Sequence, residues 1–190
     1  TETSVRRIKV RTLDLTKIDR INTFSRTLAK HPVSAEEAFR QLEEIKASGN
    51  YPVWLRFICA STVTFAYALL FGGSLKDALS VLGIGAVVHL MNLAMVRYGY
   101  LPFLNNFAVG FVCSFLSLLS PLVVPGTQVY IMIISSVMLY LPGMAMTNGV
   151  RDLLAGDLVS GLTRLGEAIL TVLAIGFGTA LAISIVPRLV

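Results

Sequence analysis

Charged residues are scarce over most of this sequence. They make up 14% of its 190 residues, and residues 51–190 hold only ten of them, against seventeen in residues 1–50. A soluble domain usually has about a quarter of its residues charged. Together with 55% hydrophobic residues and a mean hydropathy of +0.73, this scarcity argues against a soluble fold for residues 51–190. It predicts a membrane domain that follows a polar segment at residues 1–50.

Cysteine and histidine are also rare, with two of each in the chain. Cys59 and Cys113 lie in apolar runs, so we expect packed thiols and neither a disulfide nor a metal site. The net charge of +5 comes mostly from residues 1–50, and a basic segment beside a membrane is typical of a topology signal. We therefore predict no nucleic-acid partner, no bound metal and no cofactor.

The beginning of the chain lacks a basic-then-apolar signal peptide, and its first residue is Thr1. We therefore expect the sequence to start inside a longer protein. Residues 5–10 have weak strand character. Asp14 or Thr16 is suited to cap a first amphipathic helix.

Ser34 and Glu37 have the spacing of a capping box, in which each side chain bonds the other residue's backbone N–H, and this predicts the start of a second amphipathic helix. Two such helices bury little surface. We expect them to complete a cytoplasmic subdomain with upstream residues or to lie against the membrane domain.

Five apolar stretches are each long enough to cross about 30 Å of hydrocarbon, which takes roughly 20 helical residues. We predict spans at about 52–71, 75–95, 103–124, 128–146 and 165–186. The first and third connections are short, so the helices that they join should be antiparallel neighbours. The predicted fold class is an all-α membrane protein with five transmembrane helices at 51–190 and an N-terminal amphipathic helical cytoplasmic segment at 1–50.

Basic residues predict the orientation of this domain. The ten Lys and Arg residues of the N-terminal segment fall on the same side as Arg97, Arg151 and Arg164, whereas the other side has only Lys76 and Arg188. Because Lys and Arg concentrate in cytoplasmic loops, we expect the N-terminus in the cytoplasm and the C-terminus outside.

One stretch, residues 141–167, combines a helix-breaking Pro142-Gly143 pair with half of the charges found beyond residue 50. These charges are Arg151, Asp152, Asp157, Arg164 and Glu167. A charge at the centre of a bilayer costs about 2.5–3.5 kcal/mol on insertion scales, and broken helices form solute and ion sites in transporters. The stretch therefore favours a site for a solute or a proton. The alternative is a plain helix end at the cytoplasmic surface.

Each charged side chain of this stretch suggests a role. The planar fork of Arg151 suits a carboxylate, and Asp152 and Asp157 are suited to carry a proton if burial raises their pKa. Arg164 and Glu167 lie three residues apart, so they can pair on one helix face. The alternative is that both arginines mark topology and that the acids are their surface partners.

Other polar residues interrupt the spans singly. Arg56 and Asp77 lie near span starts and are expected to extend to the interface. His89 lies deeper, near Asn92, and suits either a proton relay or a hydrogen-bonded packing residue. The pair at 105–106, Asn105 and Asn106, suits a helix cap or the lining of a polar site.

The run PGMAMTNGVRDLLAGDLVSGLTRLGEA at residues 142–168 resembles the signature of the threonine/serine exporter (ThrE) family. The matching positions are Pro142-Gly143, Thr147-Asn148, Arg151-Asp152, Gly156-Asp157, Ser160-Gly161, Arg164 and Glu167. Residues 15–45, Tyr51-Pro52 and the run GGSLKDAL at 72–79 also resemble the family. The resemblance thus covers nearly the whole chain.

This resemblance implies ion-driven export of threonine and serine, or of small dicarboxylates such as succinate, across a bacterial inner membrane. It makes the chain similar to the larger, five-helix half of a split exporter that works with a small membrane partner. We expect that partner or a homo-oligomer, because an odd number of spans suits an inverted second half.

On this basis we assign two sets of site residues. The solute-binding set is Pro142, Gly143, Thr147, Asn148 and Arg151, and the proton- or ion-coupling set is Asp152, Asp157, Arg164 and Glu167. We expect no enzyme activity. The alternatives are a metal-dependent lipid-head-group transferase, faintly suggested by the acids, and a membrane scaffold that transports nothing.

Overall fold

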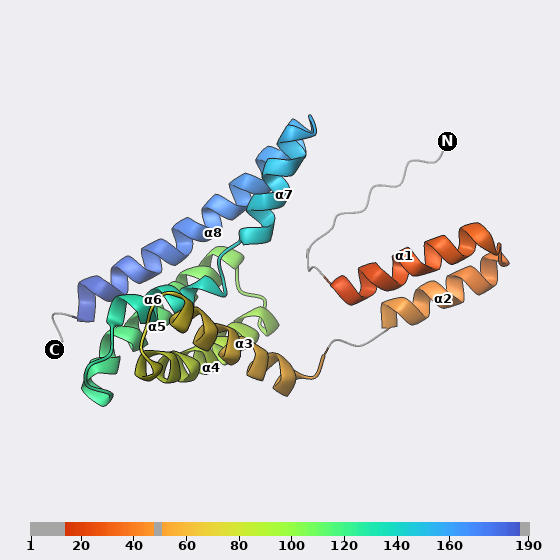
Figure 1. Cartoon of the computed structure of the whole chain (residues 1–190). Coiled ribbons are helices and arrows are strands. Elements are labelled where there is room, and N and C mark those ends of the chain that lie inside the picture. The colour runs from red at the N-terminus through yellow and green to blue at the C-terminus, as the bar shows by residue number, and fades with distance from the viewer. Residues whose placement is uncertain (1–13, 48–50, 187–190) are drawn as a thin grey trace. The chain divides into compact units, whose positions relative to one another are not determined.

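The structure is a computed structural model that describes residues 14–47 and 51–186. The described residues form eight helices and no strand, which confirms the all-α class. The strand character at 5–10 and the position of Arg188 concern residues outside the described ranges. The chain divides into two compact units, residues 1–51 and 52–190, which we describe separately (Figure 1).

The first unit is a pair of helices, α1 (Leu15–Lys30) and α2 (Ala35–Ala47). Of the two predicted caps, Asp14 and Thr16, it is Asp14 that caps α1: its Oδ1 accepts a hydrogen bond from the Lys17 N–H at 3.1 Å. Neither helix has a buried residue. The apolar faces of these helices are therefore largely exposed within the described part of this unit.

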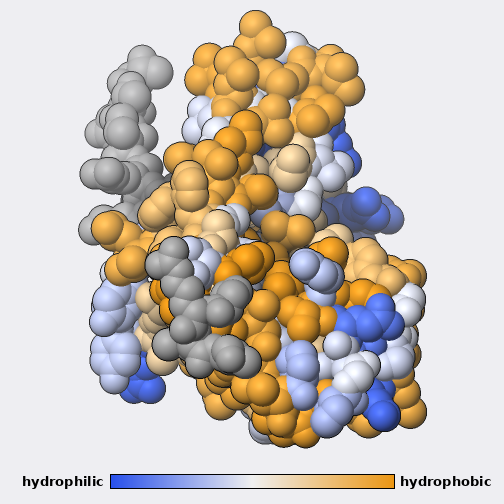
Figure 2. Space-filling model, turned by 90° about the vertical axis from the view of Figure 1, so that its left-hand side faces the viewer, coloured by the Kyte–Doolittle hydropathy of each residue, from blue (hydrophilic) through white to orange (hydrophobic). Residues whose placement is uncertain are grey.

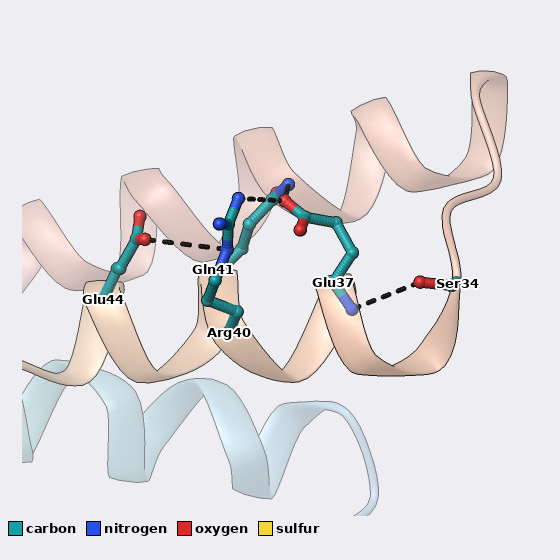
Figure 3. A network of polar contacts seen from close by, with 5 residues as sticks. All are labelled: Ser34, Glu37, Arg40, Gln41 and Glu44. Carbon is teal, nitrogen blue, oxygen red and sulfur yellow. Dashed lines mark hydrogen bonds and ion pairs between the residues drawn. The ribbon is translucent and has the colours of Figure 1, made fainter.

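The start of α2 forms one half of the predicted capping box, in which Ser34 Oγ accepts from the Glu37 N–H at 3.3 Å. The Glu37 carboxylate accepts from Arg40 at 2.8 Å and from Gln41 at 2.9 Å (Figure 3). The hydrogen bond from Gln41 lowers the pKa of Glu37 most, and the bond from Arg40 lowers it further. The acid therefore stays ionised near the N-terminus of α2, where a negative charge stabilises a helix.

The second unit contains the six apolar helices. They are α3 (Val53–Leu70), α4 (Leu75–Arg97), α5 (Pro102–Val123), α6 (Val129–Met138), α7 (Gly143–Leu154) and α8 (Leu158–Ile185). Four of them are long and apolar enough to cross a membrane, and α6 with α7 makes a fifth candidate span that is bent by 59°. Hydrophobic residues cover much of the visible surface in Figure 2, as expected of a surface in contact with lipid.

The interior of the bundle lies where α4, α5 and α6 meet, around the buried residues Val81, Val88, Val109, Cys113 and Met132. On the other side of α5 lies α8. The two backbones approach so closely that a Cβ on Gly110 or Gly178 would overlap backbone atoms of the facing helix. Small residues allow this close approach between membrane helices.

Asp77 differs from its prediction. It does not extend to the interface but is fully buried. Its Oδ2 accepts from the N–H and the Oγ of Ser74, both at 2.7 Å, and its Oδ1 accepts from the Gln128 N–H at 2.6 Å. Ser74 and Asp77 form a full capping box. The bond from Gln128 stabilises the charge of the buried carboxylate. Because Gln128 directly precedes α6, this bond also joins the start of α4 to the start of α6.

Candidate functional site

The fourth predicted span is a broken helix. It does not run unbroken to about residue 146: α6 ends at Met138, and α7 begins at Gly143 in a new direction. Pro142 has no N–H to donate to the Met138 carbonyl, so the α-helical pattern cannot continue there. In the described structure, the carbonyls of Leu139 and Tyr140 accept no backbone hydrogen bond. The break therefore leaves polar backbone groups beside an apolar bundle.

Beyond the break, α7 and the first half of α8 form a helical hairpin (Figure 1). Asp157 makes the corner, because its N–H donates to the Asp152 carbonyl at 2.9 Å and its carboxylate caps α8 by accepting from the Ser160 N–H at 3.2 Å. Helix α8 therefore begins at Leu158 and not at about residue 165 as predicted. The charged stretch is thus mostly helical.

The hairpin is held together by two glycines and an ion pair. Gly149 and Gly161 face each other's helices, where a Cβ on either would meet a leucine side chain and the other glycine's carbonyl. Arg164 Nε lies 3.0 Å from Asp152 Oδ2, with side chains 45% and 26% exposed. This oxygen accepts no aligned hydrogen bond, so the contact is a close charge pair. The structure brings Asp152 to Arg164, and the predicted pairing of Arg164 with Glu167 stays a prediction.

Other predicted solute-binding residues share α7. Thr147 is exposed, Asn148 is half-buried, and Arg151 is exposed in the last turn. Residues three or four apart lie on one helix face, so Thr147 and Asn148 both share a face with Arg151. Arg151 makes no ion pair within the described residues. The Thr147 hydroxyl donates to the Gly143 carbonyl at 3.0 Å.

Asp157 is exposed, and hydrogen bonds from the Ser160 side chain and backbone hold its pKa below the usual value. The condition for proton carriage, a pKa raised by burial, is therefore not met at this residue. An ionised Asp157 suits the cap position because a negative charge stabilises a helix N-terminus. Asp152 is the half-buried acid of the stretch.

Four other buried polar atoms lie in the second unit, on four different segments. Ser61 Oγ, His89 Nε2, Asn105 Oδ1 and Tyr140 Oη are all buried, and none has a hydrogen-bond partner. The sequence drew attention to His89 and Asn105, but a hydroxyl in an apolar run gives no sign that it will lack a partner.

The two asparagines of α5 do not cap that helix. Asn105 Nδ2 donates to Asn92 Oδ1 of α4 at 2.7 Å, and Asn106 Nδ2 lies 3.5 Å from Thr171 Oγ1 of α8. They connect α5 to its neighbours, and the lining of a polar site stays a prediction. The described residues contain no group of three His, Cys, Asp or Glu side chains able to hold a metal. Both cysteines are free, and Cys113 is buried as predicted, whereas Cys59 is exposed.

Comparison with known proteins gives a family. A family model described as "Putative threonine/serine exporter" matches residues 1–186. "Pheromone-regulated membrane protein 10" of Eremothecium gossypii is 30% identical over 89% of this chain and 23% of its own length. "Probable threonine/serine exporter" of Mycobacterium tuberculosis is 19% identical over 95% of this chain and 34% of its own length.

The chain thus spans a quarter to a third of the length of these two relatives. No solved structure matches it. The family match nevertheless covers both units, including the broken span and the charged hairpin. This chain therefore belongs to the threonine/serine exporter family.

Proposed function

We propose that this chain is a subunit of an ion-driven secondary transporter that exports small carboxylate-bearing solutes, either threonine and serine or small dicarboxylates. The observation that carries the proposal is the broken span α6–α7, which leads directly into a charged helical hairpin. Broken helices supply free backbone groups to solutes and ions in transporters. Membership of an exporter family points to transport and away from an enzyme.

In this proposal the carboxylate of the solute binds Arg151. Thr147 and Asn148 offer a hydroxyl and an amide on the same helix face, and the Pro142-Gly143 break sets the direction of that face. Arg151 is available because it has no ion pair among the described residues. Its guanidinium fork can bind both oxygens of a carboxylate.

The coupling role falls on Asp152, with Arg164 as its partner. Protonation of Asp152 removes the charge that attracts Arg164 from 3.0 Å, and this would loosen α7 from α8. Glu167 lies on the same helix as Arg164 and remains in the proposed coupling set. Asp157, whose pKa is lowered, is not proposed to carry the proton and serves as the cap that fixes the start of α8.

We also propose that this subunit needs a second half-transporter, either a small membrane protein of the same family or another copy of the chain. Helix α7 packs substantially only against α8 in the described structure. The hairpin leaves large apolar side chains exposed, among them Met144, Val150, Leu154, Val159 and Leu162. In a bacterial inner membrane with the N-terminus inside, a second half would cover part of this surface, and lipid the rest.

The test is the substitution Arg151→Lys, which keeps the positive charge and removes the planar guanidinium group that can bind both carboxylate oxygens. Export of labelled threonine, serine and succinate is measured in cells at matched protein levels. Loss of a charged hydrogen bond should weaken transport by about 1–3 kcal/mol. Arg97→Lys, at the exposed end of α4, is the matched control and should export normally. Normal export by Arg151→Lys would leave Arg151 as a topology marker.

A further inference from the structure

The α7–α8 hairpin extends past the neighbouring helix α5 (Figure 1). Helices α5 and α8 run parallel, because two side-chain contacts between them join residues that are each 65 positions apart. Pro102, the first residue of α5, is therefore level with about Glu167 of α8. Helix α8 begins nine residues earlier, at Leu158. At a rise of 1.5 Å per residue, its first part extends about 13 Å beyond the start of α5.

Helix α4 ends at nearly the same level as the start of α5. Asn92 of α4 bonds Asn105 of α5, and α4 ends at Arg97, five residues further on. Arg97 is thus about 8 Å past Asn105 and level with about Leu165 of α8. Helix α5 has 22 residues, which make about 33 Å and match a hydrocarbon thickness of about 30 Å. The tip of the hairpin therefore lies outside the hydrocarbon, where lipid tails do not cover it.

The hairpin has two edges of opposite character. Gly149 of α7 and Gly161 of α8 face the opposite helix. Each residue turns a helix by about 100°, so Asp152 and Arg164, each three positions after its glycine, lie about 60° to one side, where they form the ion pair. The positions directly after the glycines lie on the other side, and residues three, four or seven positions apart share one side. This other side, which we call the apolar edge, consists of Met146, Val150, Leu154, Leu158, Leu162 and Ile169.

The apolar edge is exposed along its whole length. The exposed fractions of its side chains are 43% for Met146, 48% for Val150, 84% for Leu154, 61% for Leu158, 63% for Leu162 and 54% for Ile169. Hydrophobic residues also cover the top of the molecule in Figure 2, where the tip of the hairpin lies. An exposed apolar patch marks an interaction site. Because the tip lies outside the hydrocarbon, a protein surface is needed to cover it.

A second copy of this chain fits the apolar edge. It inserts into the membrane in the same orientation, so its hairpin extends on the same side and presents the same residues at the same height. A two-fold axis then makes each edge the partner of the other, and the edge has no charged residue that would repel its copy. Its six side chains expose on the order of 600 Å², so two copies would bury roughly 1,200 Å², which is the lower limit for a specific stable interface.

We infer that the apolar edge joins two copies of this chain across a two-fold axis parallel to the membrane normal. Leu158 and Leu162 of one copy pack against the same residues of the other. The pair of Asp152 and Arg164 lies on the opposite edge, so it stays outside the contact and remains accessible. The inference rests on the proposed function only in that it identifies the required second half-transporter as another copy of the chain.

The experiment is site-specific cross-linking in membranes. In a chain that carries Cys59→Ser and Cys113→Ala, the variants Leu158→Cys and Leu162→Cys are each treated with a short bismaleimide. Both should give a covalent dimer of this chain. The matched control is Thr163→Cys, because Thr163 is exposed and directly follows Leu162 but is turned about 100° further from the apolar edge. It should give several-fold less dimer.

A charge on the apolar edge provides a second measurement. Leu162→Glu places like charges against each other in the dimer. Because Leu162 lies outside the hydrocarbon, the new carboxylate stays hydrated and the chain should insert normally. The fraction of dimers is counted by single-molecule photobleaching of labelled protein in phospholipid vesicles. It should fall several-fold in Leu162→Glu and stay unchanged in Thr163→Glu.

Three results would overturn the inference. They are equal cross-linking of Leu162→Cys and Thr163→Cys, a wild type that is monomeric in vesicles, and cross-linking of Leu158→Cys to a different protein in place of a second copy. Cross-linking does not require transport, whereas Arg151→Lys reports on transport itself. Failure of this inference is therefore distinguishable from failure of the proposed function.

Discussion

Helix α8 has two neighbours, and it packs against them in different ways. Its C-terminal half meets α5 at Gly110 and Gly178, backbone against backbone, with neutral hydrogen bonds such as Ser114 Oγ to Thr179 Oγ1 at 2.9 Å. Its N-terminal half meets α7 at Gly149 and Gly161, mainly through leucine side chains and a partly exposed charge pair. The first contact fixes the bundle. The second holds a segment that adjoins a helix break and can shift more easily.

The largest effect is expected from Gly178→Ala. The new methyl group would overlap the Phe107 carbonyl and the Phe111 nitrogen, which are backbone atoms that cannot move aside. Overpacking of this kind costs about 1–3 kcal/mol and occasionally more. Thermal unfolding of the purified protein measures it. A Cβ on Gly176 of the same helix has no neighbour within 4 Å, so Gly176→Ala should hardly change the unfolding temperature. Equal losses of stability in the two variants would show that the close backbone contact at Gly178 is not what stabilises the α5–α8 pair.

A smaller loss of stability is expected from Gly161→Ala. Its methyl group would meet the Leu153 side chain at 2.6 Å, which can change rotamer, and the Gly149 carbonyl at 2.9 Å. We expect α7 to move away from α8, so that export falls more than the unfolding temperature does. Gly166→Ala, with no neighbour within 4 Å, is the control. A fall in stability as large as that of Gly178→Ala would show that both contacts are equally rigid.

The charge pair should contribute less than either glycine contact. Asp152→Asn and Arg164→Gln each break a pair whose side chains are partly exposed, and such pairs are worth about 0.2–1 kcal/mol. A double-mutant cycle measured by thermal unfolding isolates the interaction free energy between Asp152 and Arg164. Export by Asp152→Asn should fall far more than stability if this acid couples ions. Unchanged export would assign Asp152 to structure alone.

The smallest effect concerns Asp157 and pH. Hydrogen bonds from Ser160 lower its folded pKa below the ordinary value of 3.8. Its contribution to stability is therefore present above that value and is lost as the pH falls through the folded pKa. Asp157→Asn keeps a capping side chain and should flatten the change in unfolding temperature between about pH 5 and pH 3. An unaltered pH profile would show that Asp157 makes no such contribution.

Apolar length was sufficient to find the four long helices that can cross a membrane, because a helix that crosses a bilayer needs a long run of hydrophobic residues. It misplaced the start of α8. The polar turn from Asp157 to Arg164 looked like a connection, although Asp157 supplies the cap that starts a helix there. The break at Pro142 was predictable from its missing N–H. The direction of α7 after the break was not, because packing against α8 decides it.

The site was predictable only in part for a similar reason. A signature shows which residues are present but not which of them face each other. The sequence offered Glu167, three residues away, as a partner for Arg164, but gave no sign that Asp152 of another helix lies beside it. The missing partners of Ser61 and Tyr140 depend on the surroundings of each hydroxyl. No local pattern records those surroundings.

The bond between Asp77 and Gln128 has a consequence for the biogenesis of this domain. It joins residues 51 positions apart, and a ribosome adds that many residues in about 3–10 s at 5–20 residues per second. The α3–α4 hairpin therefore exists for seconds before the N–H that completes the Asp77 site has been made. During that interval the carboxylate must remain hydrated. The arrival of the α5–α6 hairpin then allows it to be buried, so this one acid makes complete assembly of the first hairpin depend on synthesis of the second.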